Sequence, residues 1–288
     1  MIMNNAMVLV CCHKKDFFYD GDGFLPIQVG KALSSVDLGI HGDDTGDNIS
    51  EKNPHFCELT AQYWLWKNVV KTDYVGLNHY RRYFDFNKKY SGGYFFQNLP
   101  SEQATDKKLS LPGQKGLDSI FQKYDIILAP PMVYPVSLDI HYSAAHDKDD
   151  LLAIREILKT LYPDYLPSFD RVMTGNKLSL CNMFIMRKET FDDYSKWLFD
   201  ILFTLEKRGK TWSDSYQARV YGFLSERLLN VYVSHNNLRI KYCPVIKISE
   251  DKPLSQIKGF VKNSLYNIAY SIIKSGEECK IINKLTKK

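Results

Sequence analysis

The residues best suited to chemistry follow a short apolar stretch, YVGL, at residues 74–77. The chain then runs directly into His79, Tyr80, Arg81 and Arg82. In open α/β sheets, ligands bind beyond the carboxyl ends of the strands, and guanidinium groups hold phosphate oxygens through paired hydrogen bonds. We therefore expect His79, Arg81 and Arg82 to grip a diphosphate. The alternative is a surface turn whose arginines pair with nearby carboxylates.

A second basic group follows the first apolar stretch, MVLVCC, at residues 7–12. His13, Lys14 and Lys15 come next, where α/β nucleotide enzymes present their first ligand loop. We expect His13 and Lys14 to join the anion site, although this pattern is common and is a weak signal by itself. The sequence contains neither G-x-G-x-x-G nor G-x-x-x-x-G-K-[ST], which disfavours dinucleotide oxidoreductases and P-loop phosphotransferases.

A polar loop, GDDTGDNIS, covers residues 42–50. Its aspartates, including Asp43 and Asp47, could ligate a hard cation through oxygen together with Asn48. The spacing and the closing glutamate of an EF-hand are absent. An ordinary turn rich in Asp and Asn is the alternative, and composition alone favours that turn.

Two other places could supply a general base. His146 and Asp150 are four residues apart, so they share one face if the helix there begins early, and they could act as a base and its orienting partner. The carboxylates of Asp147 or Asp149 could equally cap that helix. Further along, Glu226 and its neighbour Arg227 interrupt an apolar helical stripe, as an internal ion pair or as part of a site.

Secondary-structure patterns must position these groups. Short apolar stretches typical of covered strands recur at residues 7–12, 74–77, 125–129, 182–186 and 240–246. Helical patterns lie between them at residues 53–71, 149–161, 189–207 and 213–234. This alternation predicts an α/β fold with a mostly parallel central sheet.

Residues 1–250 are expected to form one domain, which contains one long polar segment. Residues 87–116 are rich in Gly and Ser and lack clean periodicity. A loop of that length inside a compact domain is usually a functional lid or disordered, so we expect a lid or flexible loop close to the arginine motif.

Composition narrows the classes of protein. No apolar run reaches the roughly 18 residues that span a bilayer, and the first apolar stretch is too short for a secretory signal. The six cysteines show no C-x-x-C pair, which favours reduced thiols in the cytoplasm. Residues 251–288 hold eight lysines and three acidic residues, which account for the whole formal charge of +5. The rest of the chain is neutral in sum, which argues against a nucleic-acid binder.

Taken together, several motifs resemble a bacterial family of galactofuranosyltransferases found in capsule, exopolysaccharide and O-antigen gene clusters, formerly a domain of unknown function. The most specific strings are CELTAQYWLWKN at residues 57–68 and YVGLNHYRRYF at residues 74–84. Further matches lie, in order, at residues 13–14, 26–30, 44–50, 146, 150–151, 182–186 and 222–228. They cover the chain from about residue 8 to residue 246.

The resemblance implies a GT-A-like glycosyltransferase fold, a UDP-galactofuranose donor and an inverting transfer to a lipid-linked polysaccharide acceptor. On this reading the donor is bound by His13, Lys14, Asp47, Asn48, His79, Arg81 and Arg82. Asp150 is the expected base, with His146 and Glu226 in reserve. The alternatives are a transferase with a pyranose donor such as UDP-galactose or UDP-glucose, and a non-catalytic glycan-binding relative.

The resemblance leaves a metal open. Many GT-A enzymes hold the donor diphosphate through a divalent cation, Mn²⁺ or Mg²⁺, bound by Asp-x-Asp at a strand end. Here that strand ends at Asn78 and His79. Either the cations of this loop replace the metal, or His79 or the loop from Asp43 to Asp47 supplies ligands.

The basic tail, residues 251–288, is expected to form an amphipathic helix. Its apolar residues at helical spacing are Ile257, Phe260, Val261, Leu265, Ile268 and Ile272, with Lys258, Lys262 and Lys274 beside them. Such a helix can lie in a membrane interface with its lysines towards anionic headgroups. It could equally dock on the domain. Because a lipid-linked acceptor stays at the membrane, we expect a cytoplasmic protein attached peripherally to the inner face of the cytoplasmic membrane.

Overall fold

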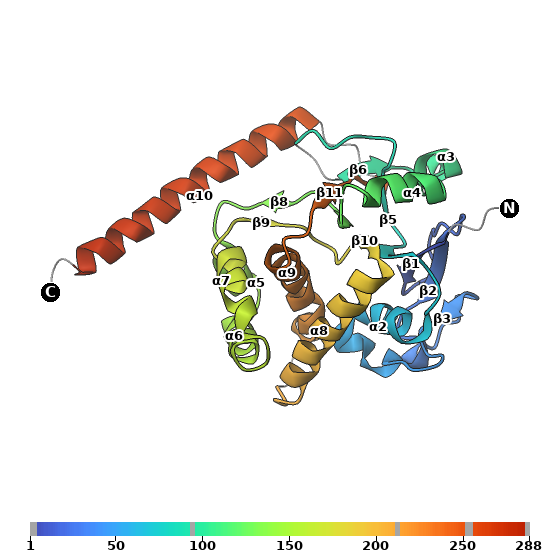
Figure 1. The fold of residues 1–288 in the computed structure, drawn as a ribbon, viewed down its shortest axis with the longest axis horizontal. Helices are drawn as coiled ribbons and strands as arrows, with labels where there is room; N and C mark the ends of the chain where they lie inside the picture. The colour runs from blue at the N-terminus through green and yellow to red at the C-terminus, as the bar shows by residue number, and fades with distance from the viewer. Residues whose placement is uncertain (1–4, 93–95, 211–213, 251–255, 286–288) are drawn as a thin grey trace.

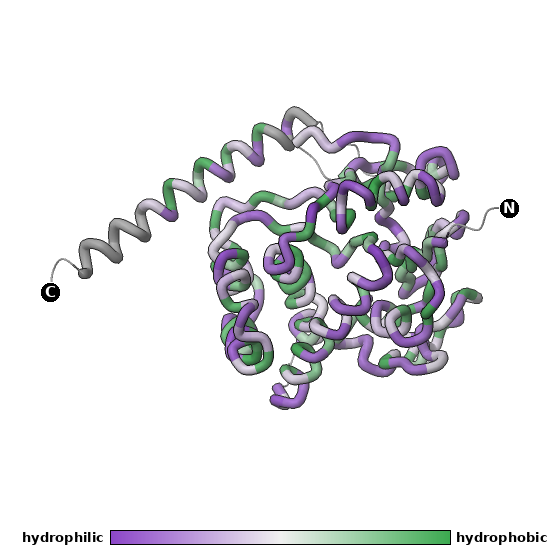
Figure 2. Tube along the Cα trace, viewed as in Figure 1, coloured by the Kyte–Doolittle hydropathy of each residue, from purple (hydrophilic) through white to green (hydrophobic). Residues whose placement is uncertain are grey.

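A computed structural model describes residues 5–92, 96–210, 214–250 and 256–285. Figure 1 shows a sheet with helices packed around it, and one long C-terminal helix that extends away from this body. The hydropathy colouring of Figure 2 places green, hydrophobic segments in the interior of the body.

The main sheet is built around two parallel strands, β1 (Ala6–Cys12) and β4 (Tyr74–His79). Its strand order is β11-β7-β10-β4-β1-β2-β3. The other members are β2 (Phe24–Gln28), β3 (His41–Gly42), β7 (Ile126–Leu128), β10 (Phe184–Arg187) and β11 (Ile240–Tyr242). Only β10 along this path runs antiparallel to its neighbours. The predicted α/β fold with a mostly parallel sheet is confirmed.

A second branch joins the sheet through β5 (Arg82–Phe84), which pairs with both β4 and β12 (Val245–Ile248). β12 also pairs in parallel with β6 (Phe96–Leu99). The single strand expected over residues 240–246 is therefore two strands, separated at Cys243 and Pro244. A proline has no N–H to donate to a ladder, so the chain changes partner there. β8 (Met132–Val133) and β9 (Lys177–Leu178) form a separate two-stranded sheet.

Helices cover both faces of the sheet. The larger core packs strand residues such as Leu9 and Leu77 mainly against five helices. These are α2 (Leu59–Asn68), α6 (Lys148–Leu161), α7 (Leu166–Met173), α8 (Lys188–Glu206) and α9 (Val220–His235). α4 (Gly113–Phe121) covers the opposite face with Leu117 and Phe121. The shorter helices are α1 (Asn53–Phe56), α3 (Asp106–Leu109) and α5 (Leu138–Ala145).

Two helices differ from the sequence prediction. The helix expected over residues 53–71 is broken at Cys57, whose φ of 52° is left-handed, so α1 ends there and α2 begins at Leu59. Asn53 stabilises this break, because its Nδ2 donates to the Cys57 carbonyl at 2.8 Å. Gly222 of α9 comes so close that an added Cβ would lie 3.3 Å from Cys57 Sγ. The break thus turns Cys57 and Glu58 towards α9. The helix expected from residue 213 begins at Val220.

Residues 87–116, the segment expected to be a lid or flexible loop, contain regular elements in their described part. β6, α3 and the start of α4 lie in it, and Leu99 and Leu109 are buried. These two apolar side chains tie the segment to a third core cluster that contains Tyr83. A movement of this segment as a lid stays a prediction.

The tail helix is α10 (Gln256–Leu285). It contacts the body through Asn176, whose Nδ2 donates to Asn267 Oδ1 at 3.2 Å, and through Tyr270, whose hydroxyl donates to the Thr174 carbonyl at 2.5 Å. None of the described helices has the length and apolarity that crossing a membrane requires.

Candidate active site

The carboxyl ends of β1 and β4 bring the two predicted basic groups together. Cys11 and His79 are paired in the ladder, so the chain segments that follow them leave the sheet side by side. The rings of His13 and Tyr80 meet edge to face with centroids 5.3 Å apart. The sequence prediction that these two strand ends form one basic surface is therefore consistent with the geometry.

The cations on this surface are mostly exposed. His13, Lys14 and Arg81 are exposed, and Arg81 and Lys14 flank the carboxylate of Asp16. Although the His13 side chain is exposed at the surface, partial desolvation of its ring lowers its pKa, and the positive charges of Lys14, Arg219 and Arg81 lower it further. A site that disfavours an added positive charge in this way is suited to an anion.

Arg219 is a functional candidate that sequence reasoning missed. It is exposed just before α9, and its Nε donates to Cys57 Sγ at 3.3 Å. The break at Cys57 therefore decides where this guanidinium lies. Phe223 and Glu226 are three residues apart on α9 and so share one face of that helix, and Arg219 precedes Phe223 by four residues, just before the helix begins. That spacing was a signal available in the sequence.

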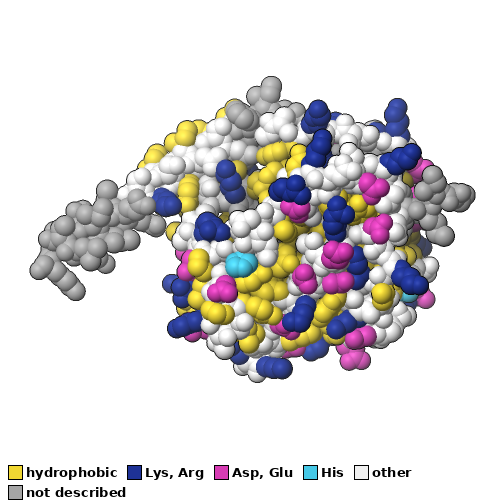
Figure 3. All heavy atoms as spheres, viewed as in Figure 1, with side chains coloured by type: hydrophobic (Ala, Val, Ile, Leu, Met, Phe, Trp, Pro, Cys, Tyr) yellow, Lys and Arg dark blue, Asp and Glu magenta, His cyan; other side chains and the backbone are white. Residues whose placement is uncertain are grey.

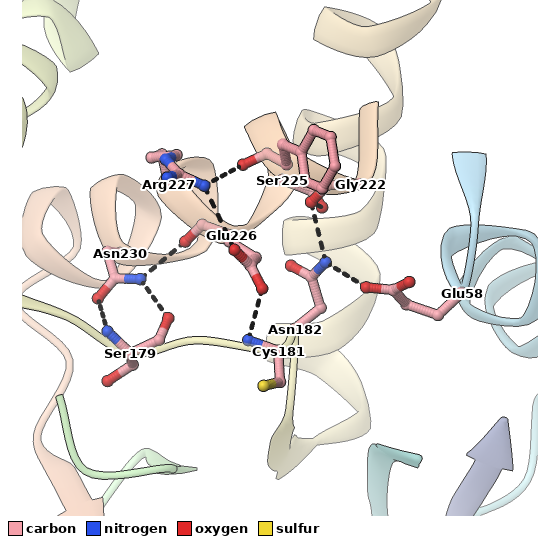
Figure 4. Close-up of polar contacts among 10 residues, drawn as sticks. Glu58, Ser179, Cys181, Asn182, Gly222, Ser225, Glu226, Arg227 and Asn230 are labelled. Carbon is pink, nitrogen blue, oxygen red and sulfur yellow. Dashed lines mark hydrogen bonds and ion pairs between the residues drawn. The ribbon is translucent and has the colours of Figure 1, made fainter. Parts of the chain in front are cut away.

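A strained turn lies beside the two strand ends. Cys181 and Asn182 both have left-handed backbones, with φ of 73° and 48°, which non-glycine residues rarely adopt. Figure 4 shows the contacts that hold the turn: Glu226 Oε1 accepts from the Cys181 N–H at 2.7 Å, and Asn182 Nδ2 donates to Glu58 Oε1 at 2.7 Å. Two carboxylates, one from the start of α2 and one from α9, thus converge on one turn.

His79 belongs to this turn and not to the cationic surface. Its Nε2 lies 2.6 Å from the Cys181 carbonyl oxygen, to which it donates. Burial lowers the pKa of His79, which favours the neutral ring. This corrects the expectation that His79 is a cation for the diphosphate: it positions the turn instead.

Glu226 is the carboxylate best placed for proton transfer. Its side chain is 19% exposed, and Oε2 lies 3.3 Å from Arg227 Nη1. Burial raises the pKa of Glu226, while Arg227 and the Cys181 N–H oppose the rise. A base with a raised pKa accepts a proton more readily near neutral pH.

Arg82, on β5, lies close enough to the turn for its charge to act on Cys181. Its positive charge favours the ionised form of Glu226, although burial still dominates the pKa of that group. Its guanidinium lies 5.7 Å from the centre of the Phe96 ring. Within the described part of the chain, Arg82 Nε is buried and has no hydrogen-bond partner. It remains in the predicted donor set.

The pair of His146 and Asp150 is different from what its spacing suggests. α6 begins only at Lys148, so His146 lies outside the helix. The Asp147 side chain caps the N-terminus of α6 by accepting from the Asp149 N–H at 3.0 Å. Asp150 is buried, with Lys210 Nζ 2.6 Å from Oδ1 and the Tyr142 hydroxyl 3.3 Å from Oδ2. Because both oxygens are occupied, an acceptor hydroxyl could reach Asp150 only by breaking these contacts. The geometry argues against Asp150 as the base.

The ion pair of Asp150 and Lys210 should instead stabilise the fold. Lys210→Met leaves a buried carboxylate unpaired, a change that costs roughly 3–5 kcal/mol when both groups are buried. Because Lys210 is 33% exposed, we expect about 2 kcal/mol of lost unfolding free energy at pH 7. Burial raises the pKa of Asp150. As the pH falls, Asp150 of the folded variant is therefore protonated, and the loss of unfolding free energy caused by Lys210→Met becomes smaller.

Urea unfolding at pH 7 and pH 5 measures this effect, with Lys196→Met as a control because that pair is mostly exposed. A Lys210→Met protein as stable as the wild type at pH 7 would contradict the structural role.

Asp47 and Asn48 lie apart from the strand-end residues. Asp47 Oδ1 accepts from the Tyr63 hydroxyl at 3.2 Å, and its backbone N–H donates to Asn68 Oδ1 at 3.1 Å. Asn48 Oδ1 accepts from the Ser50 N–H in a local turn. Asn68 ends α2 whereas Glu58 precedes it, so about 15 Å of helix separates this loop from the turn. The structure therefore does not bring Asp47 and Asn48 together with the strand-end residues, and their place in the donor site stays a prediction.

The described residues do not fit a metal-binding donor site. Asp43 is buried and its two oxygens accept from the Gly30 and Lys31 N–H groups. Among residues that the structure describes, no group of three or more His, Cys, Asp or Glu side chains is arranged to hold a metal ion. The five cysteines with described side chains are all free thiols.

Comparisons with known proteins show which family the chain belongs to. A family model described as a domain of unknown function, DUF4422, matches residues 7–237. The apo structure of WbbM, a bifunctional glycosyltransferase, is similar over 86% of this chain with 33% identity and a TM-score of 0.78. The match covers 46% of that protein, so this chain spans under half its length. No curated protein matches the chain. The likeness is consistent with the expected GT-A-like fold.

Proposed function

Because the chain belongs to the DUF4422 family and its fold is that of part of a glycosyltransferase, we propose that it transfers a sugar from a nucleotide donor to a glycan. The observation that carries the proposal is the convergence of exposed cations and a half-buried carboxylate at one sheet edge. Arg219, just before α9, and Glu226, on α9, belong to these two groups. Cations bind the diphosphate and the carboxylate accepts a proton.

In this mechanism the residues have distinct tasks. His13, Lys14, Arg81, Arg82 and Arg219 hold the diphosphate and balance the charge that develops on it as it leaves. Glu226 takes the proton from an acceptor hydroxyl. The hydroxyl oxygen bonds to the anomeric carbon from one side while the bond from that carbon to the phosphate oxygen breaks on the other. The product has the opposite anomeric configuration, and UDP leaves.

The donor we propose is UDP-galactofuranose. It is supported by the resemblance of the CELTAQYWLWKN and YVGLNHYRRYF motifs to galactofuranosyltransferases. UDP-galactose and UDP-glucose are the competing donors, because they share the diphosphate and uridine that the cations would hold. The acceptor we propose is a lipid-linked polysaccharide.

Calorimetric titration of UDP into the full chain tests the donor site and separates an enzyme from a non-catalytic relative of the same fold. We expect saturable binding that weakens with salt, because charged hydrogen bonds dominate it. A folded sample that does not bind UDP would remove the proposal.

We also propose that α10 attaches the protein to the inner membrane surface. Val261, Leu265, Ile268 and Ile272 are all at least half exposed, and their spacings of four, three and four residues place them on one face. Asn267 and Tyr270, which dock α10 on the body, lie on the opposite face. Figure 3 shows hydrophobic side chains along this helix, outside the body.

The surroundings of this apolar face suit an anionic bilayer. Lys262, one residue after Val261, is exposed beside this face, whereas Lys274 is exposed on the side of the helix that carries Tyr270. Each lysine near an anionic surface contributes about 1 kcal/mol. Ile257 and Phe260, the remaining predicted members of the face, lie outside the described side chains. A membrane-held enzyme would meet a lipid-linked acceptor often, which is consistent with this location.

The double variant Leu265→Gln, Ile268→Gln should lose sedimentation with phosphatidylglycerol vesicles, because two exposed apolar side chains no longer enter the interface. Truncation after Asp251 should have the same effect. Leu152→Gln, which changes an exposed leucine of α6, is the matched control and should sediment like the wild type. If the full chain ignores these vesicles at low salt, the attachment is wrong.

A further inference from the structure

Three aromatic rings form a stack beside the candidate active site. None of the roles described above requires this stack. His146 stacks on Phe223 with centroids 4.2 Å apart and on Tyr216 at 6.0 Å. Tyr216 and Phe223 are themselves 5.2 Å apart. His146 and Phe223 are half-buried, whereas Tyr216 is 51% exposed. The stack therefore presents one ring to solvent, supported by two others.

Hydrogen bonds fix the stack before any ligand arrives. His146 Nδ1 donates to Gln217 Oε1 at 3.1 Å, and Gln217 Nε2 donates to the Ala145 carbonyl at 2.9 Å. These bonds join the end of α5 to the residue after Tyr216. A ring held in this way loses little conformational entropy when a ligand packs on it.

The stack touches both halves of the candidate active site. The Arg219 guanidinium lies 5.6 Å from the centre of the Phe223 ring. The Phe223 carbonyl accepts from Arg227 Nη1 at 2.9 Å, and the same nitrogen lies 3.3 Å from Glu226. Phe223 and Glu226 are also one helical turn apart on α9. The stack is therefore anchored, through Phe223, to the turn of α9 that carries the proposed base.

We propose that Tyr216, backed by Phe223 and His146, binds a sugar ring of the acceptor glycan. This inference rests on the proposed function. An acceptor sugar must bring one hydroxyl to Glu226, while its apolar C–H face needs an apolar surface. An aromatic ring supplies such a surface, and the tyrosine hydroxyl remains available to the polar rim of the sugar. His146 is then a positioning residue that supports the platform.

The uracil of the donor is the competing occupant, since it is also a flat ring. The position of Phe223 one turn from Glu226 favours the acceptor, because the base must contact the attacking hydroxyl and not the nucleotide. The two occupants can be told apart by whether a substitution of Tyr216 changes the affinity for the acceptor sugar or the affinity for UDP.

Two titrations of the full chain test the platform, one with octyl β-D-galactopyranoside, in the presence of UDP, and one with UDP alone. Tyr216→Ala should weaken the galactoside at least about tenfold, which corresponds to ~1.4 kcal/mol, and leave the Kd for UDP unchanged. Tyr216→Phe keeps the ring and should restore most of the affinity. Val70→Ala, at a residue 79% exposed near the far end of α2, is the control for a general surface effect.

The outcomes separate the two proposals. If the wild type does not bind UDP, the proposed function itself fails. If UDP binds but the galactoside does not, or Tyr216→Ala leaves its Kd unchanged, the platform alone is overturned. A loss of UDP affinity in Tyr216→Ala would assign the stack to the uracil and would likewise overturn the acceptor platform.

Discussion

Glu226→Gln should reduce sugar transfer by about a thousandfold while UDP binds with nearly unchanged affinity, because a general base contributes roughly 10²–10⁴ to the rate. Glutamine keeps the shape and can still accept from the Cys181 N–H, so the strained turn is preserved. In the wild type, burial raises the pKa of Glu226, so transfer should decline as the pH falls and this carboxylate is protonated.

Glu58→Gln is the matched control for this prediction. It removes the second carboxylate at the same turn but retains an oxygen for the Asn182 amide at 2.7 Å. We expect a much smaller loss than with Glu226→Gln, since Glu58 positions the turn in this account. Full activity in Glu226→Gln would exclude it as the base, and a thousandfold loss confined to Glu58→Gln would transfer the role to Glu58.

Arg219→Ala should weaken UDP binding by about 1.5–3 kcal/mol, or roughly 10- to 150-fold, because a charged donor to the diphosphate is lost. We expect a smaller effect for Arg81→Ala, whose guanidinium is already shared with Asp16. Calorimetric titration of each variant with UDP gives the affinities directly.

Arg239→Ala is the control for the change in net charge. Arg239 is exposed and paired with Asp125, which lies at the amino end of β7. The candidate site lies at the other end of the sheet, beyond the carboxyl ends of β1 and β4. Its removal should leave the affinity for UDP unchanged. If Arg219, Arg81 and Arg82 can each be replaced by alanine without loss of UDP affinity, the diphosphate lies elsewhere.

Periodicity predicted much of the fold because burial imposes it. β1 and β4 are buried on both faces, so their apolar runs are continuous, and the expected helix over residues 189–207 corresponds closely to α8. The break at Cys57 could not be predicted, because a left-handed cysteine carries no local signal and depends on contacts with Asn53 and α9. The same limit applies to residues 87–116, whose order depends on the burial of Leu99 and Leu109.

The candidate site divides in the same way. His13 and Arg81 were predictable because parallel strands end at a common edge. Asp150 and His146 were paired by a spacing that assumed one continuous helix, whereas α6 begins after His146. The spacing of Arg219 to Phe223 and Glu226 could be read from the sequence, but its contact with Cys57, which lies more than 160 residues earlier in the chain, could not.

The most direct test of the central claim is the release of UDP from UDP-galactofuranose by the full chain, measured beside UDP-galactose and UDP-glucose. We expect turnover that is fastest with UDP-galactofuranose and that is lost in Glu226→Gln. A folded, UDP-binding protein that releases UDP from none of the three donors in the presence of a glycan acceptor would contradict it.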